Sequence, residues 1–391
     1  MKWPSDRISK SSPKSFGMYE KARKLMDQGI DVIHLEVGMP SFDTPQHIKD
    51  GAIAALQGGL VHYGDFAGNA GLRRAIAKRL ADHNAVKFSE NEIVVTNGLT
   101  HASYAVMMAA IDPVDEVILL EPYYPQHVNK IELAGGKVVL APLDKARNFA
   151  IDPQSIEARI TPKTKMICLV NPANPTGRVY SREELQSLAD IAIRHDLLVL
   201  SDEVYEQIVY DGAEHISIAS LPGMRERTFS LFAFTKAYAM DGWRIGYIAA
   251  DARYMPAILK ITMNDVAHVN VFIQEGARAA LEGPQDVIRE MLDDDKRRRD
   301  LVVARMNQMS GVICATPEGT IYAYPDISAT GKSSAKVAEE ILEQCHVVTE
   351  AGSFYGAAGD GYLRICFGAE PYERIEEALN RMARYFAECG E

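Results

Sequence analysis

Short apolar runs alternate with longer amphipathic stretches through the first 283 residues of the chain. Unbroken apolar runs are typical of strands covered on both faces, whereas apolar positions spaced three and four residues apart indicate helices. The pattern predicts seven strands, at residues 92–96, 116–121, 137–141, 166–170, 197–201, 228–233 and 244–249. It predicts helices between them, at residues 70–84, 100–111, 126–134, 182–195 and 253–264. This alternation favours an α/β fold with a mostly parallel sheet and helices on both faces.

The pattern changes after about residue 283. A long charged helix that contains the run DDDKRRRD is expected at residues 284–309. After it we expect strands near 312–315, 320–324, 347–350 and 362–367, and helices near 333–345 and 371–387. Such a mixture indicates a smaller α+β domain. The predicted parts are an N-terminal segment, 1–45, that joins the small domain, a large domain, 46–285, and a small C-terminal domain, 286–391.

Composition and charge exclude several classes of protein. Of the 391 residues, 47% are hydrophobic and 24% are charged, as is typical of a globular protein with a buried core. The formal net charge of −11 disfavours nucleic acid as a partner, because phosphate binding needs a basic surface. No run of about 18 apolar residues occurs, so no membrane span is predicted, and the polar N-terminus lacks the apolar stretch of a secretory signal.

The cysteines and histidines show no pattern of a disulfide framework or a metal site. The five cysteines are scattered along the chain and are never spaced as C-x-x-C. This usage is typical of a reduced, cytoplasmic protein. The ten histidines include no H-E-x-x-H spacing, so we predict no metal.

Polar residues gather where four of the predicted strands end. The segments are TNGLT at 96–100, NPANPTG at 171–177, SDEVY at 201–205 and FTK at 234–236, the last followed by Arg244. Taken singly, each segment is more often a helix cap, a rigid loop or a paired core residue. In an open α/β sheet, however, ligands bind at the carboxyl ends of the strands, so we expect these groups to share one site.

The residue types at these strand ends suit one cofactor. A lysine can form an imine, an acid can face a ring nitrogen, and phenol and amide groups can face a ring hydroxyl. A glycine-containing turn at the start of a helix presents free N–H groups to a phosphate. Together these groups predict pyridoxal 5′-phosphate (PLP) as the cofactor.

Eight segments, in this order along the chain, carry a resemblance to a known family. They are VGMPSFDTP (37–45), HYGDFAGNAGLRRAIA (62–77), TNGLTHA (96–102), EPYYPQ (121–126), NPANPTG (171–177), SDEVYE (201–206), FTKAYAMDGWRIGY (234–247) and GYLRICFG (361–368). With them the chain resembles the class I/II PLP-dependent aminotransferases, which have fold-type I and are aspartate aminotransferase-like. The resemblance implies a mostly parallel seven-stranded sheet with helices on both faces plus a smaller α+β domain. It also implies a ping-pong transfer of an amino group from an L-amino acid to a 2-oxo acid via pyridoxamine phosphate.

By this resemblance, three residues are expected to be catalytic. Lys236 would hold PLP covalently and later move a proton. Asp202 would face the pyridine nitrogen and keep it protonated, which makes the ring an electron sink. Tyr205 would hold the phenolic oxygen of the ring.

The resemblance also implies the remaining contacts. The cofactor-binding residues besides these three are Gly98, Leu99, Thr100, Tyr124, Asn174, Thr235, Arg244 and Tyr63. Tyr124 would stack on the ring, with Tyr123 as the local alternative. Tyr63 matches a tyrosine that reaches the phosphate from a partner subunit, so we expect a homodimer with shared active sites. The substrate carboxylate is expected to bind Gly38, Asn174 and Arg364.

Three positions depart from the family pattern. Ala233 stands where the family often has Ser, His127 where it has Tyr, and Ala351 where Pro is common. Ala233 removes one hydroxyl contact to the phosphate, and Ala233 and His127 are the positions that would mark an altered reaction. A lyase, cyclase or oxidase with the same fold is the alternative, because a fold does not fix the reaction. A PLP-sensing transcriptional regulator is disfavoured, because the segment before Gly38 is too short for a DNA-binding domain.

The amino donor cannot be named from the residues. Specificity for a dicarboxylate needs a second cation, and no lysine or arginine lies between Asn97 and Gln126. Arg7, Lys10 and Lys14 in the N-terminal segment are the candidates that are left.

Overall fold

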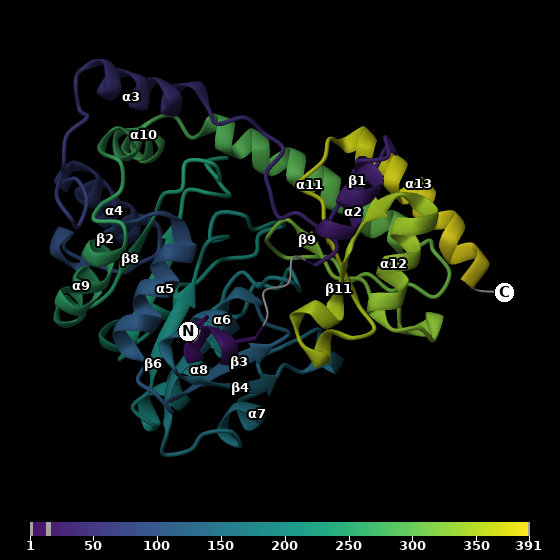
Figure 1. Ribbon diagram of the computed structural model, residues 1–391, viewed down its shortest axis with the longest axis horizontal. Helices are drawn as coiled ribbons and strands as arrows, with labels where there is room; N and C mark the ends of the chain where they lie inside the picture. Colours follow the sequence, from purple (N-terminus) through teal and green to yellow (C-terminus); the bar gives the residue numbers. More distant parts are fainter. Residues whose placement is uncertain (1–2, 13–16, 390–391) are drawn as a thin grey trace.

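The computed structural model describes residues 3–12 and 17–389. Figure 1 shows two packed bodies, one around the strands β2 to β8 and the other around β9, β11 and the C-terminal helices. The long helix α11 (Asp286–Met306) runs between the two bodies. The expected charged helix at 284–309 is therefore present, with slightly shorter bounds.

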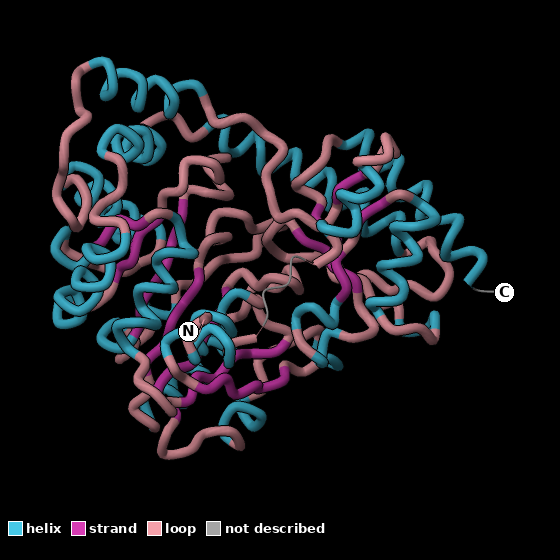
Figure 2. The backbone as a smooth tube through the Cα atoms, in the orientation of Figure 1, coloured by secondary structure: helices cyan, strands magenta, loops and turns pink. Residues whose placement is uncertain are grey.

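A seven-stranded sheet forms the centre of the larger body, as the main group of magenta strands in Figure 2 shows. Its strands are β2 (Ile93–Thr96), β3 (Glu116–Glu121), β4 (Lys137–Pro142), β5 (Thr164–Val170), β6 (Leu198–Asp202), β7 (Thr228–Ala233) and β8 (Gly246–Ala249). They lie in the order β2-β8-β7-β6-β5-β3-β4. β8 is antiparallel to both of its neighbours, whereas the pairs from β7 to β4 are parallel. The predicted fold class is confirmed.

Helices cover both faces of this sheet because alternate side chains of each strand point to opposite sides. In β3, Ile118 packs in one buried cluster with Leu185 and Leu188 of α8 (Arg182–Arg194). Its neighbour Leu119 packs in another cluster with Val106 of α5 (Gly98–Ala110). Neighbouring side chains of this apolar run therefore pack against helices on opposite faces of the sheet.

The predicted strands of this sheet lie within two residues of the observed bounds at each end. The same holds for the predicted helices that correspond to α4 (Ala70–His83), α5, α6 (Gln126–Ala134), α8 and α9 (Met255–Asp265).

Four of the described helices that pack in the larger body have no counterpart in the sequence pattern. They are α1 (Asp6–Lys10), α3 (Gln46–Gln57), α7 (Pro153–Glu157) and α10 (Val271–Glu282). α3 and α10 pack on each other through small residues, since a Cβ added at Gly51 would lie 2.8 Å from the Cβ of Ala279. Glycine inside a helix weakens the apolar periodicity from which helices are predicted.

The smaller body contains short strands. β9 (Tyr322–Ala323), β11 (Glu350–Ala351) and β12 (Leu363–Cys366) form an antiparallel sheet in the order β11-β12-β9, and β1 (Ile33–His34) pairs in parallel with β10 (Val347–Val348). The predicted strand at 312–315 is wrong. Ile313 forms only an isolated bridge with Asp326 and is 71% exposed, and Pro317 soon follows, which has no N–H with which to extend a ladder.

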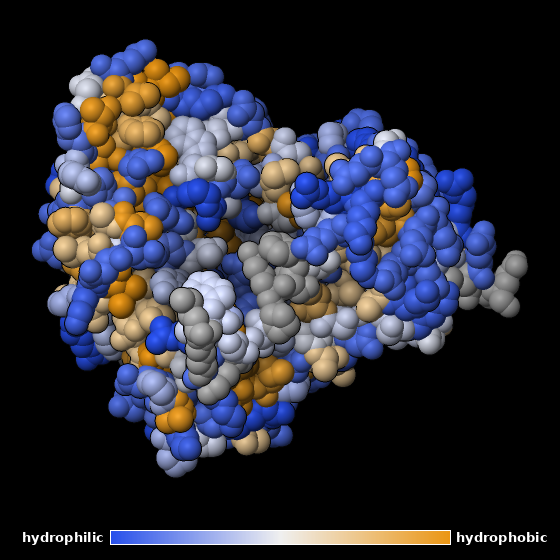
Figure 3. Space-filling model, in the orientation of Figure 1, coloured by the Kyte–Doolittle hydropathy of each residue, from blue (hydrophilic) through white to orange (hydrophobic). Residues whose placement is uncertain are grey.

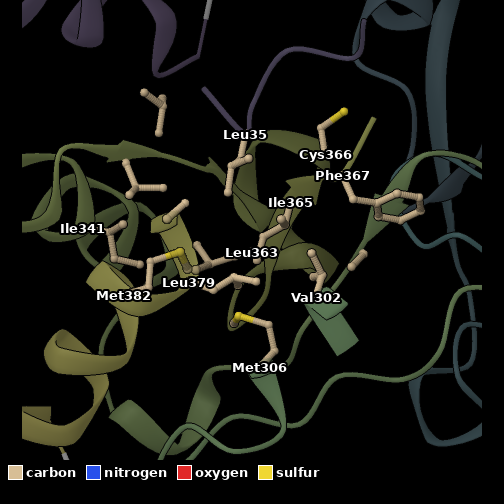
Figure 4. Packing of buried hydrophobic residues seen from close by; sticks show 14 of the residues in the cluster. Leu35, Val302, Met306, Ile341, Leu363, Ile365, Cys366, Phe367, Leu379 and Met382 are labelled. Carbon is tan, nitrogen blue, oxygen red and sulfur yellow. The ribbon is translucent and has the colours of Figure 1, made fainter. Parts of the chain in front are cut away.

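One apolar core holds the smaller body together, as Figure 4 shows. It gathers Ile341 of α12 (Ser334–Cys345), Met382 of α13 (Tyr372–Cys389), Met306 of α11 and Ile365 of β12. Leu35, which follows β1, lies in the same cluster. The boundaries at residues 45 and 285 stay a prediction.

Within residues 3–12 and 17–389, no helix combines the length and the apolar character that a membrane crossing needs. In the same part of the chain, His, Cys, Asp and Glu side chains do not form a group of three or more that could hold a metal ion.

The packing predicts a contrast between two identical substitutions. Ile118→Ala removes a fully buried side chain of β3 and should lower the free energy of unfolding by about 2–5 kcal/mol. Ile313→Ala, at the 71% exposed position, should change it by no more than about 0.5 kcal/mol. Denaturant unfolding of both variants measures the difference, and equal losses would contradict the assignment of β3 to the core.

Candidate active site

The polar segments predicted from the sequence meet at one edge of the large sheet. β5 and β6 are paired so that Val170 lies beside Asp202, and Asp202 lies beside Leu231 of β7. Asn174 and Lys236 lie in the loops that follow β5 and β7. The parallel register therefore brings the three polar side chains to neighbouring strand ends.

Lys236 lies in the turn after β7, and its ammonium group donates a hydrogen bond to the carbonyl oxygen of Gly38. Burial lowers the pKa of Lys236 to about 8. An amine with a lowered pKa is a better nucleophile near neutral pH, because more of it is uncharged. The structure thus places two predicted site residues together that are far apart in the sequence.

Asp202 is buried at the end of β6, where His127 is its nearest cation-forming neighbour among the described residues. The Nε2 atom of His127 lies 3.6 Å from Oδ2 of Asp202, and the backbone N–H of Val204 donates to Oδ1 at 3.3 Å. Burial lowers the pKa of His127, which favours a neutral imidazole. Its ring also packs edge-on against Tyr124, with centroids 5.4 Å apart. The residue that departs from the family pattern is therefore a neighbour of the predicted catalytic acid.

A buried lysine lies one turn further along α6. Lys130 is buried, and its Nζ donates to Oγ of Ser103 at 2.7 Å. Ser103 in turn donates to the carbonyl oxygen of Leu99 at 2.8 Å. Burial lowers the pKa of Lys130 to about 8. Sequence reasoning missed Lys130, although its place three residues after His127 on a helix puts both on one face.

Arg364 lies on β12 with its guanidinium buried against the larger body. It donates to Oδ1 of Asn174 at 3.2 Å and to the carbonyl oxygen of Glu36. The ring centroids of Tyr322 and Tyr355 lie 4.3 and 5.1 Å from its central carbon. A planar cation held in this way matches the bidentate geometry of a carboxylate.

Tyr205 is also buried, and its hydroxyl lies 2.8 Å from that of Tyr322. Sequence reasoning missed Tyr322, which comes from the two-residue strand β9.

The predicted phosphate turn begins α5. Gly98 has a φ of +74°, and a Cβ added there would lie 2.5 Å from Nη2 of Arg244. Arg244 is exposed and donates to the carbonyl oxygen of Asp241 at 2.8 Å. A helix N-terminus beside a guanidinium is an anion-binding arrangement. Leu99 and Thr100 follow in the first turn of the helix, Leu99 buried and Thr100 exposed.

Other predicted residues lie near the site or away from it. Tyr124 lies beside His127. The backbone N–H of Tyr123 donates to the backbone carbonyl oxygen of Tyr355 at 2.9 Å. Thr235 is half-buried next to Lys236.

Tyr63 is 92% exposed and packs only its edge against His268, with centroids 5.6 Å apart. Arg7 lies on the short helix α1 (Asp6–Lys10) and is exposed. Lys14 lies outside the described residues, and the side chain of Lys10 is not described.

Comparisons with known proteins identify the family. The family described as aminotransferase class I and II matches residues 30–382. The aromatic-amino-acid aminotransferase 2 of Thermococcus litoralis is 38% identical over 98% of both chains. The aspartate aminotransferase of Pyrococcus abyssi is 39% identical over 98% of both chains. The crystal structure of the aromatic aminotransferase from Pyrococcus horikoshii has a TM-score of 0.89 at 39% identity and covers 94% of this chain and 99% of its own.

The chain belongs to the class I and II aminotransferases. It is a transferase that moves amino groups from amino acids to 2-oxo acids and depends on PLP.

The residues at the sheet edge fit that cofactor. They offer a lysine with a lowered pKa, a buried carboxylate, a buried phenol and a helix N-terminus beside an arginine. Bound PLP supplies an electron sink for the substrate carbon. The protein supplies the groups that hold it and the proton-transfer group.

The phosphate turn predicts a contrast between two glycines. Gly98→Ala and Gly59→Ala both place a side chain at positive φ, +74° and +80°, and each should lose about 1–2 kcal/mol of stability. Only at Gly98 would the new Cβ meet Arg244, because nothing lies within 4 Å of it at Gly59. Titration of the cofactor-free proteins with PLP should therefore show weaker binding for Gly98→Ala alone. If both variants bind PLP equally well, the turn is not the phosphate site.

Proposed function

We propose that Lys236, Asp202 and Tyr205 carry the amino-transfer reaction of this enzyme. The observation that supports this most is that Lys236 and Arg364 each bond a carbonyl oxygen of the same N-terminal segment, Gly38 and Glu36 respectively. Lys236 would hold PLP and then take the proton from the α-carbon of the amino acid through its Nζ. Its lowered pKa supports this role, because a general base works best with a pKa near the working pH.

Asp202 would face the ring nitrogen of the cofactor. A carboxylate stabilises a protonated ring nitrogen by charge, and the burial of Asp202 strengthens that interaction. His127 lies 3.6 Å from this acid, and burial lowers the pKa of His127, which favours the uncharged imidazole and so limits competition for the carboxylate. Tyr205 would hold the phenolic oxygen of the ring.

The cofactor would be held by contacts that differ along its length. Tyr124 would stack on the ring, and Asn174 would face the ring oxygen as well as the substrate. Gly98, Leu99, Thr100, Thr235 and Arg244 would surround the phosphate.

The α-carboxylate of the substrate would bind Arg364, Asn174 and the backbone of Gly38. Arg364 already contacts Asn174, so a carboxylate would join an existing polar pair. The relatives act, by their names, on aspartate and on aromatic amino acids. We propose an L-amino acid as donor and a 2-oxo acid as acceptor, and a screen of donors against pyruvate, 2-oxoglutarate and oxaloacetate would identify the pair.

We further propose a homodimer with shared active sites. The 92% exposure of Tyr63 leaves its ring accessible to a second copy of the chain, and the partner's Tyr63 would reach the phosphate of this subunit. Figure 3 shows apolar side chains gathering over α3 and α10 on the same body. The exposed apolar residues of this region are Ile53, Leu56, Leu60, Val61 and Phe66, and a groove of about 460 Å³ runs between α3 and α10. Exposed apolar patches of this kind typically mark protein interfaces.

The cysteines whose side chains are described are free and buried, namely Cys168, Cys314, Cys345 and Cys366. They support a cytoplasmic location, because thiols stay reduced there.

The role of Lys236 predicts a covalent label. The purified protein should be yellow, and borohydride should fix PLP onto Lys236, as peptide mapping would show. Lys236→Ala should lose the visible band and nearly all activity. Lys130→Met, which alters the other buried lysine with a pKa near 8, should keep the band. A label on a different lysine would overturn the assignment.

The shared site predicts complementation between two inactive variants. Mixed dimers of Tyr63→Ala and Lys236→Ala contain one site with both native residues, so an equal mixture should regain about a quarter of the wild-type activity. As the matched control, Lys236→Ala mixed with Arg364→Ala should regain none, because those two residues would serve the same site from one subunit. Verified mixed dimers without any recovery would count against sharing.

A further inference from the structure

Tyr322 lies where the cofactor end and the substrate end of the proposed site meet. It is 2% exposed and stands on β9, which pairs with β12 so that Tyr322 lies beside Cys366. Its backbone N–H donates to Oγ1 of Thr320 at 3.1 Å. The backbone of Tyr322 is therefore held both by its strand partner and by its own loop.

The hydroxyl of Tyr322 contacts Tyr205. The two oxygens are 2.8 Å apart, and the rings meet edge-on at 79° with centroids 5.7 Å apart. This distance is that of a normal O–H···O hydrogen bond. Taken alone, the pair allows either hydroxyl to donate the hydrogen bond to the other.

The ring of Tyr322 covers Arg364. The central carbon of the guanidinium lies 4.3 Å from the ring centroid, within the range of a cation–π contact. One face of the cation is thus shielded from water, while Nη1 bonds Asn174 at 3.2 Å.

Gly38 makes room for the same hydroxyl. A Cβ added at Gly38 would lie 1.9 Å from the oxygen of Tyr322 and 3.0 Å from the ring carbon that bears it. Any other residue at this position would displace Tyr322. Three residues predicted from the sequence therefore converge on one residue that the sequence motifs do not contain.

The direction of the hydrogen bond follows from proton counting. Each phenol has one O–H group and can donate one hydrogen bond. In the proposed function, Tyr205 donates that hydrogen bond to the ring oxygen of the cofactor. Tyr205 then has only lone pairs to offer Tyr322, so Tyr322 must be the donor. A phenol that accepts a hydrogen bond becomes a stronger donor itself, because hydrogen bonds in a chain polarise one another. Burial raises the pKa of Tyr322, so its proton is retained at neutral pH.

We propose that Tyr322 is a positioning residue that donates a hydrogen bond to Tyr205 and covers Arg364, so that one side chain aligns the cofactor contact and the carboxylate clamp. This inference rests on the roles proposed for Tyr205 and Arg364.

Tyr322→Phe removes the hydroxyl and keeps the ring over Arg364. The loss weakens the bond from Tyr205 to the ring oxygen, so the pKa read from the visible spectrum of the bound cofactor should rise by about 0.4–1 units. For the same reason kcat should fall by about two- to tenfold, while KM for the amino donor stays within about twofold. Tyr322→Leu, which also uncovers the guanidinium, should raise KM in addition.

Tyr324→Phe is the matched control. Tyr324 lies two residues along the chain, is also buried, and its hydroxyl lies 3.4 Å from the carbonyl oxygen of Gly352 rather than near Tyr205. It should keep the visible pKa of the wild type.

A second measurement needs no cofactor. In the cofactor-free protein, the melting temperatures of Tyr205→Phe, Tyr322→Phe and the double variant form a cycle. If the two hydroxyls bond each other, the double variant should lose less than the sum of the single losses. Additive losses together with an unchanged visible pKa in Tyr322→Phe would overturn the proposal, as would a large rise in KM without a change in that pKa. Wild-type protein without a visible PLP band would instead count against the proposed function.

Discussion

The arrangement of the two bodies depends on one buried charge, the guanidinium of Arg364. A buried cation without partners is costly, so its surroundings must supply hydrogen bonds and charge. Asn174 after β5 and the carbonyl of Glu36 in the N-terminal segment accept its hydrogen bonds, and Glu350 lies opposite Arg364 in the register of β11 and β12. Burial raises the pKa of Glu350 to about 7, although Arg364 opposes that rise. The bond to Asn174 joins the small sheet to the loop after β5, at the strand ends of the large sheet, which is where a substrate would have to touch both bodies.

The larger sheet is the part that is most predictable from the sequence. β3 and β7 lie at the predicted residues, because each is a continuous apolar run that the core covers on both faces. α3 and α10 escape prediction because glycine and alanine contacts between them replace an apolar stripe. The strands β9, β10 and β11 are each two residues long, and their bounds are decided by pairing with distant residues. The strand expected at 312–315 does not form for the same reason, since Ile313 pairs with Asp326 only, in an isolated bridge.

The residues of the site also differ in how well the sequence predicts them. Lys236, Asp202 and Asn174 follow long predictable strands in segments of unusual composition, so local sequence was enough to single them out. Tyr322 lies in an ordinary apolar segment, and only its contacts with Tyr205, Gly38 and Arg364 give it a part in the site. His127 could be noticed as a departure from the family pattern, but its 3.6 Å distance to Asp202 depends on how α6 packs. Sequence motifs thus find the groups proposed to do chemistry more readily than the group proposed to align them.

We propose that Arg364 binds the α-carboxylate, the part that all amino-acid substrates share. Steady-state kinetics of Arg364→Gln with donors of different side chains test it most directly, with Arg299→Gln, another buried arginine, as the control. In Arg364→Gln we expect that PLP stays bound and that KM rises by about 100-fold for every donor, since the lost contact is a buried charge pair. The control should lose stability and keep its KM values. An effect confined to one class of side chain would contradict the account and move Arg364 from the α-carboxylate to the specificity pocket.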